Sequence, residues 1–99
     1  METSQAGKLL QKMVELEMRD RGMTDPERMV GKHVSVSMQA TDFAGVPVGP
    51  EYDATVRVLL GRLVAGGQLD DDPQESARTA RSYVVTERGI EWLRGLGML

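Results

Sequence analysis

The chain has 99 residues, 40% of them hydrophobic, and with one Trp, two Tyr and one Phe it can bury one compact core made largely of Leu, Val and Met. Its formal net charge is -3 and no third of the chain carries an excess of Lys and Arg, which excludes a strongly basic segment. The lack of cysteine excludes disulfides, thiolate metal sites and a cysteine nucleophile. With no apolar stretch of about 18 residues and no signal-peptide core, we expect a cytoplasmic protein without a membrane segment.

The first predicted element is a helix from Ala6 to about Arg21, preceded by a frayed end over residues 1–5. Its apolar side chains form an arc that is wider than one face on a small core requires. The members of this arc are Leu9, Leu10, Met13, Val14, Leu16 and Met18. Two interpretations stay open: the helix packs wholly against its own domain, or part of the arc contacts another chain.

A second, shorter helix is predicted after the break at Gly22. Residues 24–27 (TDPE) have the composition of a capping box with Pro in the first turn, and they start a helix that reaches about Lys32. His33 is the only histidine, and it has neither a Cys nor a second His with which to hold a metal ion. We interpret it as a surface residue at a helix end.

Residues 34–44 fit either a strand or a short helix. The Val34-Ser35-Val36 alternation is typical of a strand, and the β-branched residues extend that pattern. Alternatively, Ser37 caps a short helix that turns Met38 and Phe43 inward. In both cases residues 45–49 (GVPVG) form a turn, because Pro47 prevents a helix from continuing.

The clearest helical pattern runs from Pro50 to Ala65. Proline suits a first helical position, and the glycine pair at 66–67 provides a left-handed stop. Apolar residues recur with the spacing of one buried face at Val56, Leu59, Leu60, Leu63 and Val64. The outward positions are then Glu51, Thr55, Val58 and Arg62, flanked by Asp53 and Arg57.

A β-hairpin and a last helix are predicted beyond this point. Residues 68–69 begin the hairpin, residues 81–86 return it, and the polar residues between them form a loop that carries Arg78 and Arg81. Thr86 then caps a helix. Its apolar residues are Ile90, Trp92, Leu93 and Leu96.

Helix, glycine turn, hairpin and helix follow one another in the order of a winged helix. The segment from Met38 to Leu96 resembles winged helix-turn-helix regulators of bacteria and archaea, and it is most similar to small regulators of the MarR and PadR groups. The matching residues are Val56, Arg57, Leu59, Leu60, Leu63, Gly67, Leu69, Tyr83, Thr86, Gly89 and Leu93. We therefore expect a mainly α fold with a small β-hairpin (α+β), in which residues 34–99 form a winged helix and residues 1–33 an N-terminal helical extension.

The resemblance implies a DNA-binding transcriptional regulator, in which the helix of residues 50–65 enters the major groove and residues 70–82 form the wing. The expected DNA-binding residues are Thr55, Arg57, Arg62, Arg78 and Arg81. Terminal helices mediate dimerisation in such regulators. We accordingly expect a homodimer held together by Leu9, Leu10, Met13, Trp92 and Leu96.

A second function stays open because acidic residues stand among these positions. Glu51 and Asp53 begin the helix, and residues 70–72 (DDD) begin the wing, where carboxylates repel phosphate. The alternative is a winged helix that binds protein, such as a polymerase, a replication or partition factor, or another regulator. We expect neither an enzyme nor a metal or cofactor, because the sequence lacks paired-carboxylate, phosphate-loop, metal-ligand and nucleophile–base motifs.

Overall fold

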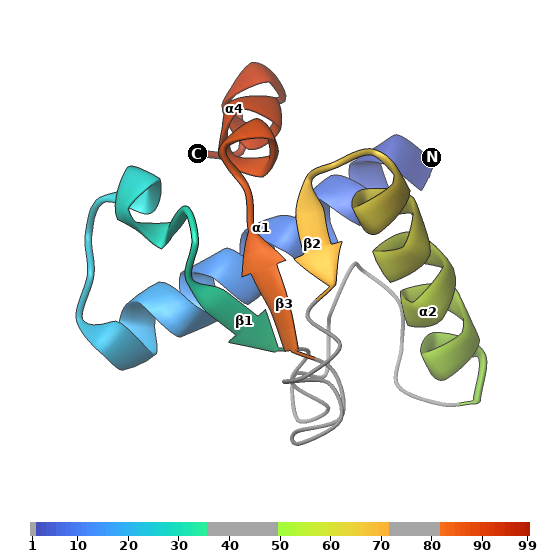
Figure 1. Ribbon diagram of the computed structural model, residues 1–99. Coiled ribbons are helices and arrows are strands. Elements are labelled where there is room, and N and C mark those ends of the chain that lie inside the picture. The colour runs from blue at the N-terminus through green and yellow to red at the C-terminus, as the bar shows by residue number, and fades with distance from the viewer. Residues whose placement is uncertain (1, 36–49, 72–81) are drawn as a thin grey trace.

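The computed structural model describes residues 2–35, 50–71 and 82–99. These residues form, in chain order, α1 (Glu2–Arg21), the 3-10 helix η1 (Pro26–Met29), β1 (His33–Ser35), α2 (Pro50–Ala65), β2 (Leu69–Asp71), β3 (Ser82–Val85) and α4 (Glu87–Gly95). The described part of the protein is thus mostly helical with a small antiparallel sheet (Figure 1), which confirms the predicted α+β class. The predictions for residues 36–49 and for the tip of the wing lie outside the described residues.

The sheet has the strand order β1-β3-β2, with β3 antiparallel to both neighbours. Strands β2 and β3 pair as the predicted hairpin, with Leu69 opposite Val85. Strand β1 pairs with the other edge of β3 and places Val34 opposite Tyr83. This second pairing joins residues almost fifty positions apart, so it ties the N-terminal part of the chain to the C-terminal part.

The segment before β1 differs from the prediction. In place of a helix that reaches Lys32, it forms only the short η1, and its cap is Asp25, whose carboxylate accepts a hydrogen bond from the backbone N–H of Glu27 at 3.1 Å. The chain leaves the helical conformation at Val30, which has a ψ of 126°, and Gly31 follows with a φ of 82°. The N–H of Gly31 donates to the carbonyl of Val85 at 2.8 Å, so pairing with β3 replaces the helix.

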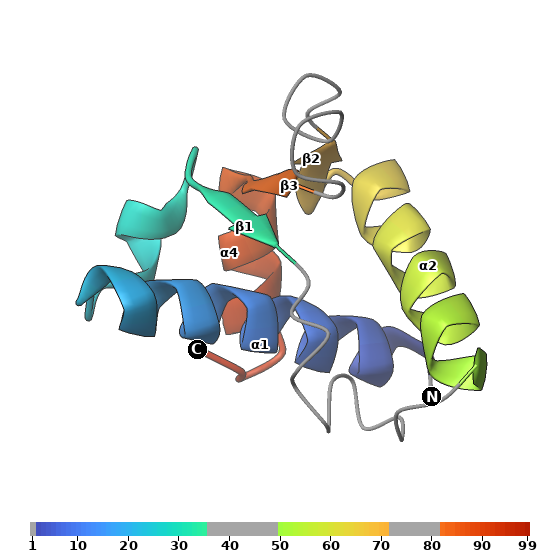
Figure 2. The ribbon, with the colours of Figure 1, turned by 90° about the horizontal axis from the view of Figure 1, so that it is seen from below.

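Helix α1 lies beneath the sheet in the view of Figure 2 and contacts α2, β1, α4 and η1. Contacts on several sides explain the width of its apolar arc. The core side chains are Ala6, Leu9, Leu10, Met13, Val14, Met29, Val34, Val56, Leu59, Leu60, Leu63, Leu69, Val85, Ile90 and Leu93. The members of this one core come both from residues 1–33, the predicted extension, and from residues 34–99. Helix α1 begins at Glu2, so residues 2–5 are helical and not frayed.

The junction between α2 and β2 ends the helix where the sequence predicts. The N–H of Gln68 donates to the carbonyl of Leu63 at 2.9 Å, and that of Gly67 donates to Val64 at 3.1 Å. This pair of bonds is a Schellman motif, which needs a left-handed residue, and Gly67 supplies it with a φ of 80°. The motif fixes the direction in which the chain leaves α2 and enters the sheet.

Candidate functional site

Helix α2 lies at one edge of the molecule, at the opposite end from η1 (Figures 1 and 2). The four side chains predicted to face inward are buried: Val56, Leu59, Leu60 and Leu63. The exposed side chains described on this helix are Ala54, Arg57, Val58, Arg62 and Ala65, together with the backbone of Gly61. The opposite side of α2 thus faces outward over at least three turns, and Thr55 lies half-buried at its border.

Two arginines border this outward surface. Since an α-helix turns by about 100° per residue, Arg57 and Arg62 are separated by about 140° around the helix axis. Val58 and the three small residues at positions 54, 61 and 65 fall between them. The outward surface of α2 is therefore an apolar strip with one cation along each border.

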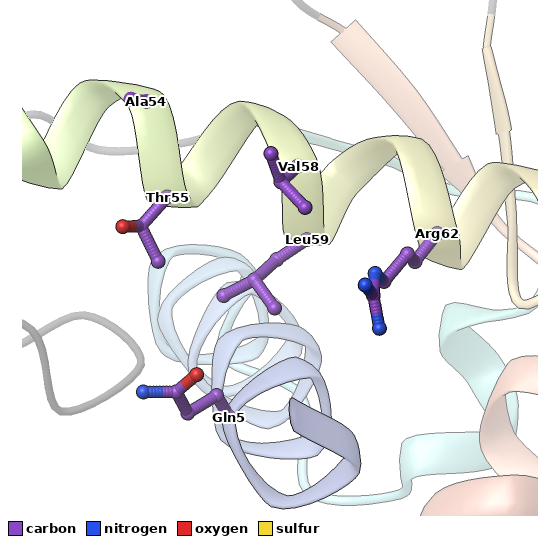
Figure 3. A pocket seen from close by; sticks show the side chains of 6 residues that line it. All are labelled: Gln5, Ala54, Thr55, Val58, Leu59 and Arg62. Carbon is purple, nitrogen blue, oxygen red and sulfur yellow. The ribbon is translucent and has the colours of Figure 1, made fainter. Parts of the chain in front are cut away.

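Beside this strip, a shallow groove separates α2 from the beginning of α1 (Figure 3). Gln5 lines it from α1, and Thr55, Leu59 and Arg62 line it from α2, with Ala54 and Val58 at its upper border. Its volume of about 270 Å³ is below the range of about 300–1,000 Å³ that encloses a drug-sized ligand. The groove therefore suits a contact with a larger surface better than the capture of a small molecule. The part played by Gln5 was missed in the sequence, because residues 1–5 were expected to be frayed.

Helix α2 is held in place at its C-terminal end by contacts with the beginning of α4. The hydroxyl of Thr86 donates to the carbonyl of Gly67 at 2.6 Å and accepts the N–H of Gly89 at 3.0 Å. One hydroxyl thus caps α4 and at the same time binds the turn that ends α2. The predicted cap is confirmed, and it has a second partner that the sequence did not reveal.

Gly89 completes this attachment. A Cβ at this position would lie 2.3 Å from the carbonyl oxygen of Gln68, so only glycine allows α4 to approach the turn so closely. Arg88 lies over the same turn, and its guanidinium donates to the carbonyl of Gly66 at 3.4 Å. The residues Gly67, Thr86 and Gly89, which carry part of the family resemblance, therefore orient α2 relative to the sheet and α4.

The structure places three of the five predicted DNA-binding residues and leaves two undescribed. Thr55, Arg57 and Arg62 lie on or beside the outward surface of α2, whereas Arg78 and Arg81 lie outside the part of the chain whose side chains are described. Asp70 and Asp71 are exposed on β2, just beyond the C-terminal end of α2. The cations of α2 thus have acidic neighbours at that end.

The predicted dimer residues separate into two groups. Leu9, Leu10 and Met13 are at most 1% exposed in the protein's own core, so they offer no surface to a second copy. This favours the first of the two interpretations of the apolar arc. Trp92 is half-buried and Leu96 is 39% exposed, and these two residues of the C-terminal region keep some surface.

A second hollow lies between η1 and α4, and sequence reasoning did not find it. It has a volume of about 280 Å³ and brings together the carboxylates of Glu27, Glu87 and Glu91. Val30, which is exposed, and Ile90, which is buried, provide its apolar lining. The carboxylate of Glu27 forms an ion pair with Arg94, so the hollow has an acidic excess. The sequence signal was weak, because Glu27 is sixty residues from Glu87 and the pair Glu87 and Glu91 alone is an ordinary helix-face pair.

None of the described helices is long and apolar enough to cross a membrane, and no group of three or more His, Asp or Glu among the described residues could hold a metal ion. Comparisons with protein-family models, with curated proteins and with solved structures gave no significant match. The outward surface of α2 and the acidic hollow are therefore the two candidate sites of function in the described part of the chain.

Proposed function

We propose that this protein is a DNA-binding transcriptional regulator of the winged-helix type, in which α2 enters the major groove. The observation that carries the proposal is the outward surface of α2, with Arg57 and Arg62 along its two borders. Residues 54–69 contain two arginines and no Asp or Glu, and Asp53 stands one helical turn before Arg57. A helix at the edge of a domain, exposed over three turns, is accessible to a duplex.

The arrangement of the elements supports the winged-helix interpretation. Helix α2, the glycine turn, β2, β3 and α4 follow in the expected order. Strand β1 joins the hairpin at its other edge to give the order β1-β3-β2. The contact of Thr86 and Gly89 with the turn holds α2 at a fixed angle to the hairpin, as a recognition helix beside a wing requires.

Dimensions and charge suit a major groove. An α-helix with its side chains is about 10–12 Å across, and the groove of B-DNA is about 12 Å wide. With about 140° between them, Arg57 and Arg62 would reach the phosphates of the two strands that border the groove. Thr55, on the same side as Arg62, would add a hydrogen bond, and Arg78 and Arg81 of the wing would add further phosphate contacts.

Two cations on α2 give limited affinity, so the proposal includes a homodimer that presents two such helices. Because Leu9, Leu10 and Met13 belong to the core, the contact between copies would use Trp92 and Leu96. Paired half-sites about one helical turn apart would then supply the specificity that one copy lacks.

The test is fluorescence anisotropy with a labelled random duplex at low and near-physiological salt. Arg57→Ala and Arg62→Ala should each weaken binding and lower the salt slope by about 0.9 for each copy of α2 on the duplex, or about 1.8 for the proposed homodimer. Arg28→Ala is the matched control. It removes the same charge from an exposed arginine on η1, which lies at the opposite end of the molecule from α2. An equal loss in all three variants would indicate net charge alone, and an absence of salt-dependent binding would exclude the function.

The acidic hollow favours a second candidate, a module that binds the basic segment of a protein partner. Glu87 and Glu91 would pair with Lys or Arg, while Val30 and Ile90 would pack against the aliphatic stems of these side chains. This face lies on η1 and α4, away from α2. Titration with a Lys- and Arg-rich peptide tests it: the double variant Glu87→Gln/Glu91→Gln should lose peptide binding, whereas Arg57→Ala should retain it.

A further inference from the structure

Val58 is 55% exposed, the largest exposed fraction among the large hydrophobic side chains that the structure describes. It lies near the middle of α2, between the borders marked by Arg57 and Arg62. Its neighbours on the outward surface are Ala54, four residues before it, and Gly61, three residues after it. Ala54 and Gly61 therefore leave Val58 uncovered on their side, where a Cβ at Gly61 would meet no atom within 4 Å, and the long side chain of Arg62 lies four residues after it.

This surface limits how α2 can distinguish one base from another. Hydrogen bonds to base edges in the major groove come mainly from Asn, Gln, Arg, Lys, Asp, Glu and Ser or Thr. From residue 54 to residue 65 the strip between the two arginines has none of these, because residues 54, 58, 61 and 65 are Ala, Val, Gly and Ala; Glu51, predicted to face outward, precedes this stretch by one turn. What the strip can contact is apolar, and the apolar group that DNA presents in the major groove is the C5-methyl group of thymine.

We propose that Val58 recognises thymine through its C5-methyl group, with the arginines at the borders of α2 holding the helix in the groove. This inference depends on the proposed DNA-binding function and specifies the base that the same surface reads. The small residues at positions 54 and 61 allow the helix backbone to come close to the bases, so that the two methyl groups of Val58 reach the floor of the groove. Thr55, half-buried on one border, carries another methyl group, which points into the groove toward α1 (Figure 3).

Replacing thymine by uracil provides a direct test, because uracil lacks the methyl group and keeps the same hydrogen-bonding atoms. Anisotropy is measured with an alternating A·T duplex and with its A·U counterpart at low salt. Wild-type protein should bind the thymine duplex more tightly by about fourfold for each methyl group that Val58 covers. Val58→Ala should reduce this preference and keep the salt dependence, since both arginines remain. Leu99→Ala, which also removes an exposed apolar side chain but lies outside α2, should keep the full preference.

The outcomes separate the inference from the function on which it rests. Salt-dependent binding with equal affinity for the two duplexes overturns the recognition of thymine and leaves DNA binding intact. No binding to either duplex at low salt removes both. A third outcome also overturns the inference: if sedimentation shows a dimer that Val58→Ala weakens, a second copy covers this strip. Circular dichroism of each variant checks that the fold is retained, which is expected for a change at an exposed position.

Discussion

Replacing Gly89 by alanine tests the contact that orients α2. The added methyl group would lie 2.3 Å from the carbonyl oxygen of Gln68, whereas close C···O contacts in proteins measure about 3.3 Å or more. The obstacle is backbone, and the carbonyl carbon of Gln68 lies at 3.2 Å as well, so no side-chain rotation relieves the overlap of about 1 Å. Relief requires a shift of α4 away from the turn.

The expected cost follows from two opposing effects. Overpacking costs about 1–3 kcal/mol, and a backbone obstacle belongs at the upper end of that range. Replacing glycine by alanine in a helix raises the free energy of unfolding by about 0.5–1 kcal/mol. Gly89→Ala should therefore lower the free energy of unfolding by about 2 kcal/mol and the melting temperature by about 8–16 °C.

Urea and thermal unfolding followed by circular dichroism measure both quantities. The matched control is Gly61→Ala in α2, where the added methyl group meets nothing within 4 Å and φ is not positive. It should raise stability by about 0.5–1 kcal/mol. If Gly89→Ala were as stable as Gly61→Ala, α4 would not approach the turn as closely as the position of Gln68 indicates.

Two further substitutions test the attachment and the core. Thr86→Ala removes both the cap of α4 and the 2.6 Å hydrogen bond to Gly67, and it should lower the free energy of unfolding in urea by about 1–2 kcal/mol. Thr86→Ser keeps the hydroxyl and should keep most of the stability. If both variants lost the same stability, the effect would come from the methyl group of Thr86. Leu10→Ala leaves a cavity at a fully buried site and should lower the free energy of unfolding by about 2–5 kcal/mol. The melting temperature of this variant should not depend on protein concentration. A loss that depends on concentration would instead place Leu10 at a contact between copies.

The helices were predictable because their signals are local. Helix α2 runs over the predicted residues, Pro50 to Ala65, since a proline, an apolar repeat of one face and a glycine pair all act within the segment. The same holds for Thr86 as the cap of α4. The wrong prediction before β1 has a cause that is distant in sequence. Residues 30–32 follow a good helix start, but the carbonyl and N–H groups of Val85 on β3 draw this segment into pairing with the sheet.

The same difference between local and long-range signals decides which features of the candidate site could be predicted. Periodicity alone placed Thr55, Arg57 and Arg62 on the outer side of α2, because burial of Val56 and Leu60 fixes the rotation of the helix. It could not show which atoms hold that helix, since the bond from Thr86 to Gly67 spans nineteen residues. Nor could it decide what covers α1. A wide apolar arc looks the same whether α4 and β1 or a second chain packs on it, and only the tertiary contacts assign it to the core.

The salt dependence of DNA binding can count how many copies of α2 contact the duplex. Each phosphate neutralised on B-DNA contributes about 0.9 to the slope of log affinity against log salt. The double variant Arg57→Ala/Arg62→Ala removes two cations from each copy, whatever the wing contributes. If one α2 contacts the duplex, the slope should therefore fall by about 1.8, and if two copies bind together it should fall by about 3.6. The proposed homodimer requires the larger change, and a fall of about 1.8 at protein concentrations that saturate the duplex would show that a single copy binds and that the half-site model is wrong.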